Sequence, residues 1–80
     1  MTVTYGLLDK VLKNLGLTRY EKDHQIVYST KEIGPVVVYP ERPDTEIVAP
    51  WHLSMARHSI VEMGFAEKEE FEQALERAAA

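Results

Sequence analysis

The sequence predicts an α+β fold: a three-stranded antiparallel sheet with helices on one face, in the order α-β-β-β-α-α. Apolar residues recur at helical spacing near the start, three short β-prone runs joined by tight turns follow, and two further helical patterns come after residue 50. A sheet covered on one face makes a two-layer sandwich, the smallest arrangement that buries an apolar sheet surface. The 80 residues are expected to form a single domain, 1–80.

The first helix is expected over residues 3–15, where one side of the helix is apolar and the other is polar. The hydroxyl of Thr2 or Thr4 can cap its start, and Gly16 suits the left-handed residue that ends a helix. The apolar positions are Val3, Leu7, Leu8, Val11, Leu12 and Leu15. We expect this helix to belong to the core.

The first two strands are expected over residues 17–22 and 25–30. Lys22 and Asp23 are predicted to form the hairpin turn, so that His24 stands where the chain enters the second strand. Rigid backbone holds a histidine at such a junction while its side chain still reaches solvent, and an imidazole changes charge near neutral pH. His24 is therefore the first candidate for a functional residue, and the alternative is a solvated turn histidine without a role in function.

The third strand is expected over residues 35–40, an apolar run that begins and ends with proline. It follows a short connection in which Gly34 is free to adopt a positive φ angle. A polar loop at 41–48 then leads to the second half of the chain. Three short strands joined in this way predict an antiparallel meander.

Two helices are expected after the loop. The first runs from Pro50, which suits the first helical position, to Gly64, which suits the stop. Trp51 is expected to staple the loop to this helix. The last helix is expected over 67–79, with acidic residues in its first turn, where they favour the helix dipole.

Composition excludes several classes of protein. The chain has no cysteine, which excludes disulfides, thiolate chemistry and cysteine-ligated zinc and fits a reducing compartment. The longest apolar run, at 35–39, is too short to span a bilayer, and no signal-peptide pattern opens the chain. A soluble, cytoplasmic protein without a membrane anchor is expected.

Charge is divided unevenly along the chain. The net charge is −4, but residues 1–40 carry five basic and four acidic side chains, whereas residues 41–80 carry four basic and nine acidic ones. Proteins that bind nucleic acid draw much of their affinity from neutralised phosphates. An RNA-binding surface is therefore expected only in the first half.

The order of these features resembles the HicA family, the small toxins of bacterial type II toxin–antitoxin pairs, and the expected arrangement resembles the double-stranded-RNA-binding fold. The resemblance extends over most of the chain, and residues 66–80 form an added C-terminal helix outside the family core. It depends on Leu15-Gly16-Leu17, His24 at the hairpin, Val36-Val37-Val38-Tyr39-Pro40, and a helix that contains His52, Leu53, Arg57, Ile60, Met63 and Gly64.

The resemblance implies an endoribonuclease that cleaves mRNA without a metal or other cofactor and is inhibited by a HicB-like antitoxin protein. The catalytic histidine of the family corresponds to His24. The family has a Gly-Ser-His-like turn, whereas Lys22 and Asp23 precede the histidine here. Either Lys22 contacts phosphate while Asp23 orients His24, or the chain has lost cleavage and kept the scaffold.

Metal-free RNA cleavage needs a general acid or base and cations that stabilise charge on the phosphate. His24 is the candidate for the first role. Aromatic rings can also stack on unpaired bases, which makes Tyr20 and Tyr28 candidates. The alternatives are that Tyr28 serves the sheet and that Lys31 is a solubilising turn residue. The candidate RNA-binding residues are Lys22, Arg19, Lys31, Tyr28, Lys10 and Lys13.

No metal site is expected. His52 and His58 lie six positions apart on one predicted helix, so their side chains point in different directions and do not converge on an ion.

A second hypothesis keeps the same scaffold without catalysis. The altered turn, the negative net charge and the acidic last helix favour a protein- or RNA-binding module, as a monomer or a weak homodimer.

Overall fold

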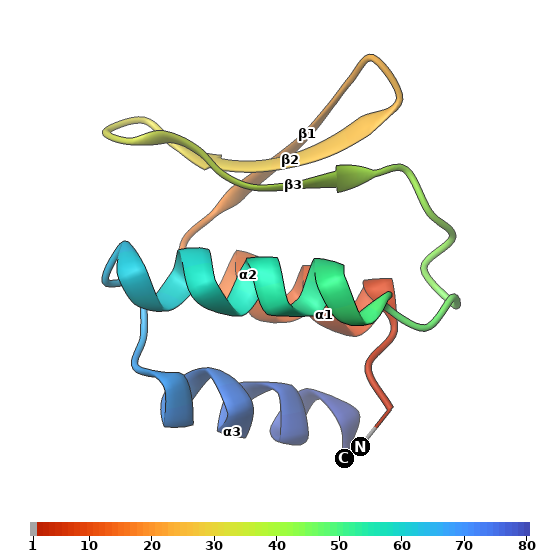
Figure 1. The fold of residues 1–80 in the computed structure, drawn as a ribbon, viewed down its shortest axis with the longest axis vertical. Helices are drawn as coiled ribbons and strands as arrows, with labels where there is room; N and C mark the ends of the chain where they lie inside the picture. Colours follow the sequence, from red (N-terminus) through yellow and green to blue (C-terminus); the bar gives the residue numbers. More distant parts are fainter. Residues whose placement is uncertain (1) are drawn as a thin grey trace.

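The computed structural model describes residues 2–80 and confirms the α+β class and the order α-β-β-β-α-α (Figure 1). One antiparallel sheet has the strand order β1-β2-β3. The elements are α1 (Tyr5–Asn14), β1 (Thr18–Lys22), β2 (Gln25–Thr30), β3 (Gly34–Pro40), α2 (Pro50–Glu62) and α3 (Lys68–Ala79).

The helices lie on one side of the sheet. In Figure 1, α2 lies in front of α1, and both helices lie beneath the strands and complete the two-layer sandwich. The last helix, α3, packs against α1 and α2 on the side away from the sheet. The core lies between these layers, and its largest fully buried side chains include Tyr28, Phe71 and Leu8.

Helix α1 is held at both ends. The Thr4 hydroxyl accepts a hydrogen bond from the Leu7 N–H at 3.2 Å, so Thr4 is the cap. The predicted stop is confirmed, because Gly16 has a φ angle of 98° and its N–H bonds to the carbonyl of Lys13.

Backbone carbonyls of the loop before α2 complete the N-terminus of α1. The N–H groups of Tyr5 and Gly6 donate to the carbonyls of Glu46 and Asp44, each at 3.0 Å. A Cβ on Gly6 would lie 3.2 Å from both the side chain and the carbonyl of Asp44, so only glycine allows this close approach without a shift. The loop is therefore docked on the first helix.

The β1–β2 hairpin differs by one residue from the prediction. Lys22 pairs with Gln25, and the two turn residues are Asp23 and His24, with φ angles of 51° and 63°. A two-residue turn with both residues at positive φ matches the right-handed twist of the strands, and aspartate tolerates that conformation. The prediction that Lys22-Asp23 forms the turn is wrong, and His24 lies in the turn itself.

A β-bulge shapes the covered face of the sheet. The register between β2 and β3 shifts at Tyr28 and Ser29, and both Val36 and Val37 reach the core as a result. On the opposite face, which no helix of residues 2–80 covers in Figure 1, the paired residues Tyr20, Val27 and Val38 lie side by side.

The two later helices begin and end as the sequence indicates. Pro50 occupies the first turn of α2, and Gly64 follows its end with a φ angle of 78°. Glu67 and Glu70 form a reciprocal capping box at the start of α3. Within residues 2–80, no helix combines the length and the apolar character needed to cross a membrane.

Candidate functional site

The β1–β2 turn carries the predicted catalytic residue at the end of the sheet. The side chain of His24 is 97% exposed, and its Nδ1 lies 4.0 Å from a carboxylate oxygen of Glu41. The backbone fixes the same pair, because the Glu41 N–H donates to the His24 carbonyl at 2.9 Å. The turn is therefore well ordered by hydrogen bonds while its imidazole is open to solvent.

The carboxylates of Asp23 and Glu41 flank His24. Lys22 precedes Asp23 and Arg42 follows Glu41 in sequence, but Arg42 is paired with Glu46 at 3.3 Å. In the part of the chain that the structure describes, the ion pair at His24 is with Glu41 alone. A histidine beside a carboxylate can exchange a proton, but two carboxylates repel a phosphate.

Lys31 does not join His24. It lies in the β2–β3 turn, at the other end of strand β2. Six residues of strand separate the two turns, which corresponds to about 20 Å at the usual rise of about 3.3 Å per residue. The two side chains therefore do not form one phosphate site.

Arg19 and Lys13 lie close together because both contact the same carboxylate, that of Asp9. Asp9 of α1 lies 3.0 Å from the Lys13 Nζ and 3.8 Å from the Arg19 Nε. Arg19 is also paired with Glu21 at 3.1 Å. The structure thus pairs two of the five candidate cations with acids of the same chain.

Tyr28 completes this cluster from inside the core. Its hydroxyl donates to Asp9 at 2.6 Å and lies 3.0 Å from the hydroxyl of Tyr39. Burial, together with these hydrogen bonds, raises the pKa of Tyr28 far above its ordinary range. The prediction that Tyr28 stacks on RNA bases is wrong, because its ring is fully buried.

The remaining candidate cations are exposed and dispersed. Lys10 lies on α1, Lys22 ends β1, and neither has an ion-pair partner within residues 2–80. Two separated lysines give a weaker attraction for a nucleic-acid backbone than a continuous basic surface would.

A buried polar cluster at the start of α2 was not predicted from the sequence. The Ala49 N–H donates to the Tyr5 hydroxyl at 3.2 Å, and that hydroxyl lies 2.7 Å from Nδ1 of His52. Because the hydroxyl accepts from Ala49, its own proton is available for Nδ1, which fits a neutral imidazole. Burial, and secondarily the charge of Arg42, lowers the pKa of His52.

The outer surface of α2 carries exposed apolar side chains. Trp51 is 70% exposed, Ile47 in the preceding loop is 64% exposed and Met55 is 40% exposed. We call these three residues the α2 face. The expectation that Trp51 staples the loop to the helix is wrong, since most of its indole faces solvent.

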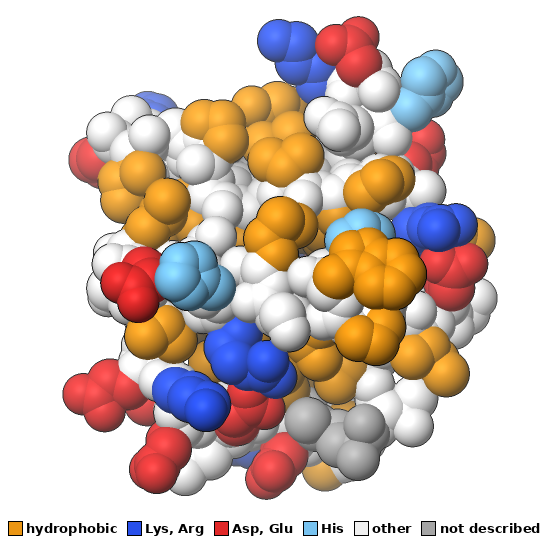
Figure 2. Space-filling view, viewed as in Figure 1, with side chains coloured by type: hydrophobic (Ala, Val, Ile, Leu, Met, Phe, Trp, Pro, Cys, Tyr) orange, Lys and Arg blue, Asp and Glu red, His pale blue; other side chains and the backbone are white. Residues whose placement is uncertain are grey.

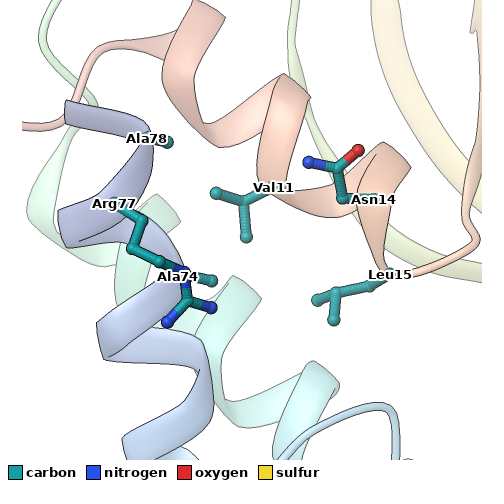
Figure 3. A pocket seen from close by; sticks show the side chains of 6 residues that line it. All are labelled: Val11, Asn14, Leu15, Ala74, Arg77 and Ala78. Carbon is teal, nitrogen blue, oxygen red and sulfur yellow. The ribbon is translucent and has the colours of Figure 1, made fainter. Parts of the chain in front are cut away.

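Several hollows lie on the helical side of the molecule. One, of about 370 Å³, lies between α1 and α3, with Val11 and Asn14 on the α1 side and Ala74 and Arg77 on the α3 side (Figure 3). A second, of about 420 Å³, lies where the chain passes from α2 to α3, next to Phe65 and Ala66. A third, of about 320 Å³, lies along α2 and reaches the start of α3. We call it the α2 hollow; its lining residues are Ser54, Arg57, His58, Val61, Glu62 and Lys68.

Comparison with known proteins assigns no relative. No protein-family model, no curated protein and no solved structure matches this chain. Within residues 2–80, no three histidine, cysteine or acidic side chains gather closely enough to hold a metal ion.

Proposed function

We propose that this chain is a non-catalytic, protein-binding module on a HicA-like scaffold with the arrangement of the double-stranded-RNA-binding fold. The proposal depends on the ion pairs, burial and positions of the candidate RNA-binding residues. Arg19 and Lys13 are held by Asp9, Tyr28 is buried, and Lys31 lies at the far end of the sheet. These positions leave no group of cations around His24.

The chemistry of phosphodiester cleavage supports the same conclusion. Catalysis depends on fixed positive groups that stabilise charge as it develops on the phosphate. At the β1–β2 turn, the ion-pair partner of the imidazole is the carboxylate of Glu41, which carries negative charge. Under this proposal, mRNA is not the substrate of the chain.

The α2 face supports binding to protein. Tryptophan and methionine are enriched at the centres of protein interfaces, where their apolar area contributes most of the affinity. Trp51 and Met55 occupy adjacent turns of one helix and are both exposed. A cytoplasmic location belongs to the proposal and is supported by the cysteine-free composition.

One observation favours a second candidate, the metal-independent endoribonuclease of a toxin–antitoxin pair with a HicB-like partner. Glu41 lies close enough to His24 to orient its imidazole and to stabilise the imidazolium that general base catalysis forms. In that case His24 acts as general acid or base, with Lys22 as the phosphate contact.

The two candidates are separated by an RNA cleavage assay in excess chelator. Wild type, His24→Ala and the control Lys31→Ala are incubated with total RNA, and folding is verified by circular dichroism. We expect no cleavage by any of the three, and no RNA affinity that falls steeply with added salt. Cleavage by wild type and Lys31→Ala that disappears in His24→Ala would instead establish the endoribonuclease.

A further inference from the structure

A buried histidine joins segments that lie far apart in the sequence. His52, in the first turn of α2, is 7% exposed. Its Nδ1 lies 2.7 Å from the hydroxyl of Tyr5, which opens α1. The same hydroxyl accepts a hydrogen bond from the N–H of Ala49, at the end of the loop before α2. One oxygen atom therefore connects the loop, the start of α2 and the start of α1.

The groups that face His52 leave a positive charge on it without a counter-charge. From β3, the ring of Tyr39 stacks on the imidazole with 5.9 Å between the ring centroids, and from α1 the nearest group is the hydroxyl of Tyr5. The loop contributes the positive charge of Arg42, and α2 itself contributes the indole of Trp51. Within residues 2–80, no carboxylate lies within ion-pair distance of His52.

A proton on Nδ1 changes the hydrogen bonding at the shared oxygen. In the neutral form, the hydroxyl of Tyr5 accepts from Ala49 and donates to Nδ1. In the imidazolium form Nδ1 is itself a donor, so two N–H groups point at one oxygen and the hydroxyl proton loses its acceptor. Tyr5 is only 2% exposed, so solvent water does not replace that acceptor. A buried donor without a partner destabilises the contact that contains it.

We propose that the loop before α2 is docked by an acid-sensitive contact: protonation of His52 releases residues 46–49 and the first turn of α2 from the start of α1, while the sheet stays folded. Few other groups hold this segment in place. Residues 41–47 are all exposed, and the Val48 N–H donates to the carbonyl of Val3 at 2.8 Å. Strands β2 and β3, in contrast, are paired from end to end.

The inference goes beyond the proposed function and does not depend on it, because the opening is measured on the chain alone. It nevertheless affects the same part of the surface. Ile47 and Trp51 of the α2 face belong to the released segment, over which Figure 2 shows exposed hydrophobic side chains. Acid would therefore rearrange the α2 face.

The direction of the pH response follows from the two states of the imidazole. Burial, and secondarily the charge of Arg42, hold the pKa of His52 below its ordinary value in the docked form. In the opened form, the imidazole is solvated and has a pKa of about 6.5. Opening is therefore constant above about pH 6.5 and increases below it. One such group can raise the opening equilibrium by at most about 25-fold between pH 7 and pH 5.

The test is native-state hydrogen exchange of the full chain, followed by NMR at pH 7 and pH 5 and at several low urea concentrations. The amides of Val48 and Ala49 report on the docked segment, and those of β2 report on the sheet. His52→Gln keeps an acceptor for Tyr5 but takes up no proton. His58→Gln, on an exposed position of the same helix, is the matched control.

In wild type and His58→Gln, we expect the protection factors of Val48 and Ala49 to fall at least about threefold from pH 7 to pH 5. In His52→Gln they should stay constant. Their exchange should be insensitive to low urea, whereas exchange of the β2 amides should require global unfolding. An equal fall in His52→Gln, or loop amides as protected and as urea-sensitive as those of β2, would overturn the inference.

A second variant tests the shared oxygen without altering the histidine. Tyr5→Phe removes the hydroxyl, so the protection of the Ala49 amide at pH 7 should fall to the level of wild type at pH 5 or below it. Protection of Ala49 that is unchanged in Tyr5→Phe would show that the hydroxyl does not hold the loop, and would also overturn the inference.

Discussion

The two edges of the sheet are protected in different ways. All five residues of β1 are exposed, and three of them, Arg19, Glu21 and Lys22, are charged. Strand β3 has no charged residue, is partly buried, and packs on α2. Charge on an exposed edge strand discourages the addition of a further strand, which explains β1 but leaves β3 to be explained.

Proline protects the edge of β3. Opposite residues in an antiparallel ladder alternate between hydrogen-bonded and non-hydrogen-bonded pairs. His24 and Glu41 form a hydrogen-bonded pair. Val27 and Val38 lie three positions further along the ladder, so they form a non-hydrogen-bonded pair. The backbone groups of Val38 and Pro40 therefore face the open edge, and proline has no N–H to donate. Pro35 withholds another N–H near the start of the strand. Both edges thus discourage strand addition, β1 through its charges and β3 through its prolines.

The largest difference between the two edges should appear in stability. Tyr39→Ala on β3 removes a buried ring that contacts Tyr5 and Tyr28, so we expect a loss of about 3–5 kcal/mol of unfolding free energy. Tyr20→Ala on β1 truncates a half-exposed ring and should cost less than about 1 kcal/mol. Urea unfolding measures both, and equal losses would show that β1 is as well buried as β3.

A single carboxylate fastens β1 to the helical layer. Asp9→Asn keeps the shape but removes the charge that holds Lys13 and Arg19 and accepts from Tyr28, so we expect a loss of about 2 kcal/mol. Glu21→Gln, which alters only an exposed pair of Arg19, should change stability by less than about 0.5 kcal/mol. If the two variants have the same urea midpoint, the contacts of Asp9 do not stabilise the packing of β1 against the helices.

The β3 side should also respond to acid. His52 stacks on Tyr39, and its folded-state pKa lies below the ordinary value of about 6.5. The unfolded chain therefore takes up a proton at a higher pH than the folded chain does. Stability should be constant above about pH 6.5 and fall as the pH drops below it, by about 1.4 kcal/mol for each unit by which the pKa is lowered.

Urea midpoints measured from pH 7.5 to pH 5 test this expectation. In His52→Gln the amide oxygen can still accept from Tyr5, and this part of the pH dependence should disappear. An unchanged profile in the variant would assign the acid sensitivity to other groups.

The smallest effect on stability should come from the prolines themselves. Pro40→Val restores an N–H at the open edge of β3 and should change the unfolding free energy by less than about 1 kcal/mol. The Pro40→Val variant should nevertheless associate more readily, because the backbone N–H groups at positions 38 and 40 then both face solvent at the open edge of β3. Light scattering at high concentration detects it, and Pro43→Val, a change of the same kind in the loop, is the control. Scattering that is equal in the two variants would mean that Pro40 does not protect the edge.

Local patterns predicted most of the fold. Helical spacing, glycine stops and the apolar run at 35–40 depend on neighbours in sequence, so α1, β3 and α2 could be placed within a few residues. The turn was misplaced because Asp23 and His24 adopt positive φ angles without a glycine to indicate them. Sequence periodicity carries no signal for that choice.

The surroundings of the candidate site could not be predicted in the same way. Whether Arg19 and Lys13 are free to bind phosphate depends on Asp9, and the contact between Arg19 and Asp9 exists only after α1 packs on the sheet. The burial of Tyr28 depends likewise on which face of β2 the helices cover. Residue type indicates a capacity for chemistry, whereas tertiary packing decides whether that capacity is used.

The docking of the loop on α1 has a consequence for the order of folding. The first N–H groups of α1 bond to carbonyls of Asp44 and Glu46, some forty residues later in the chain. During synthesis, the ribosome makes the whole of α1 and the meander before these acceptors exist. Until the loop emerges from the ribosome, the N-terminus of the helix therefore has only Thr4 as a cap. The hydrogen bonds between the start of α1 and the loop, which enclose some forty residues, form late in folding.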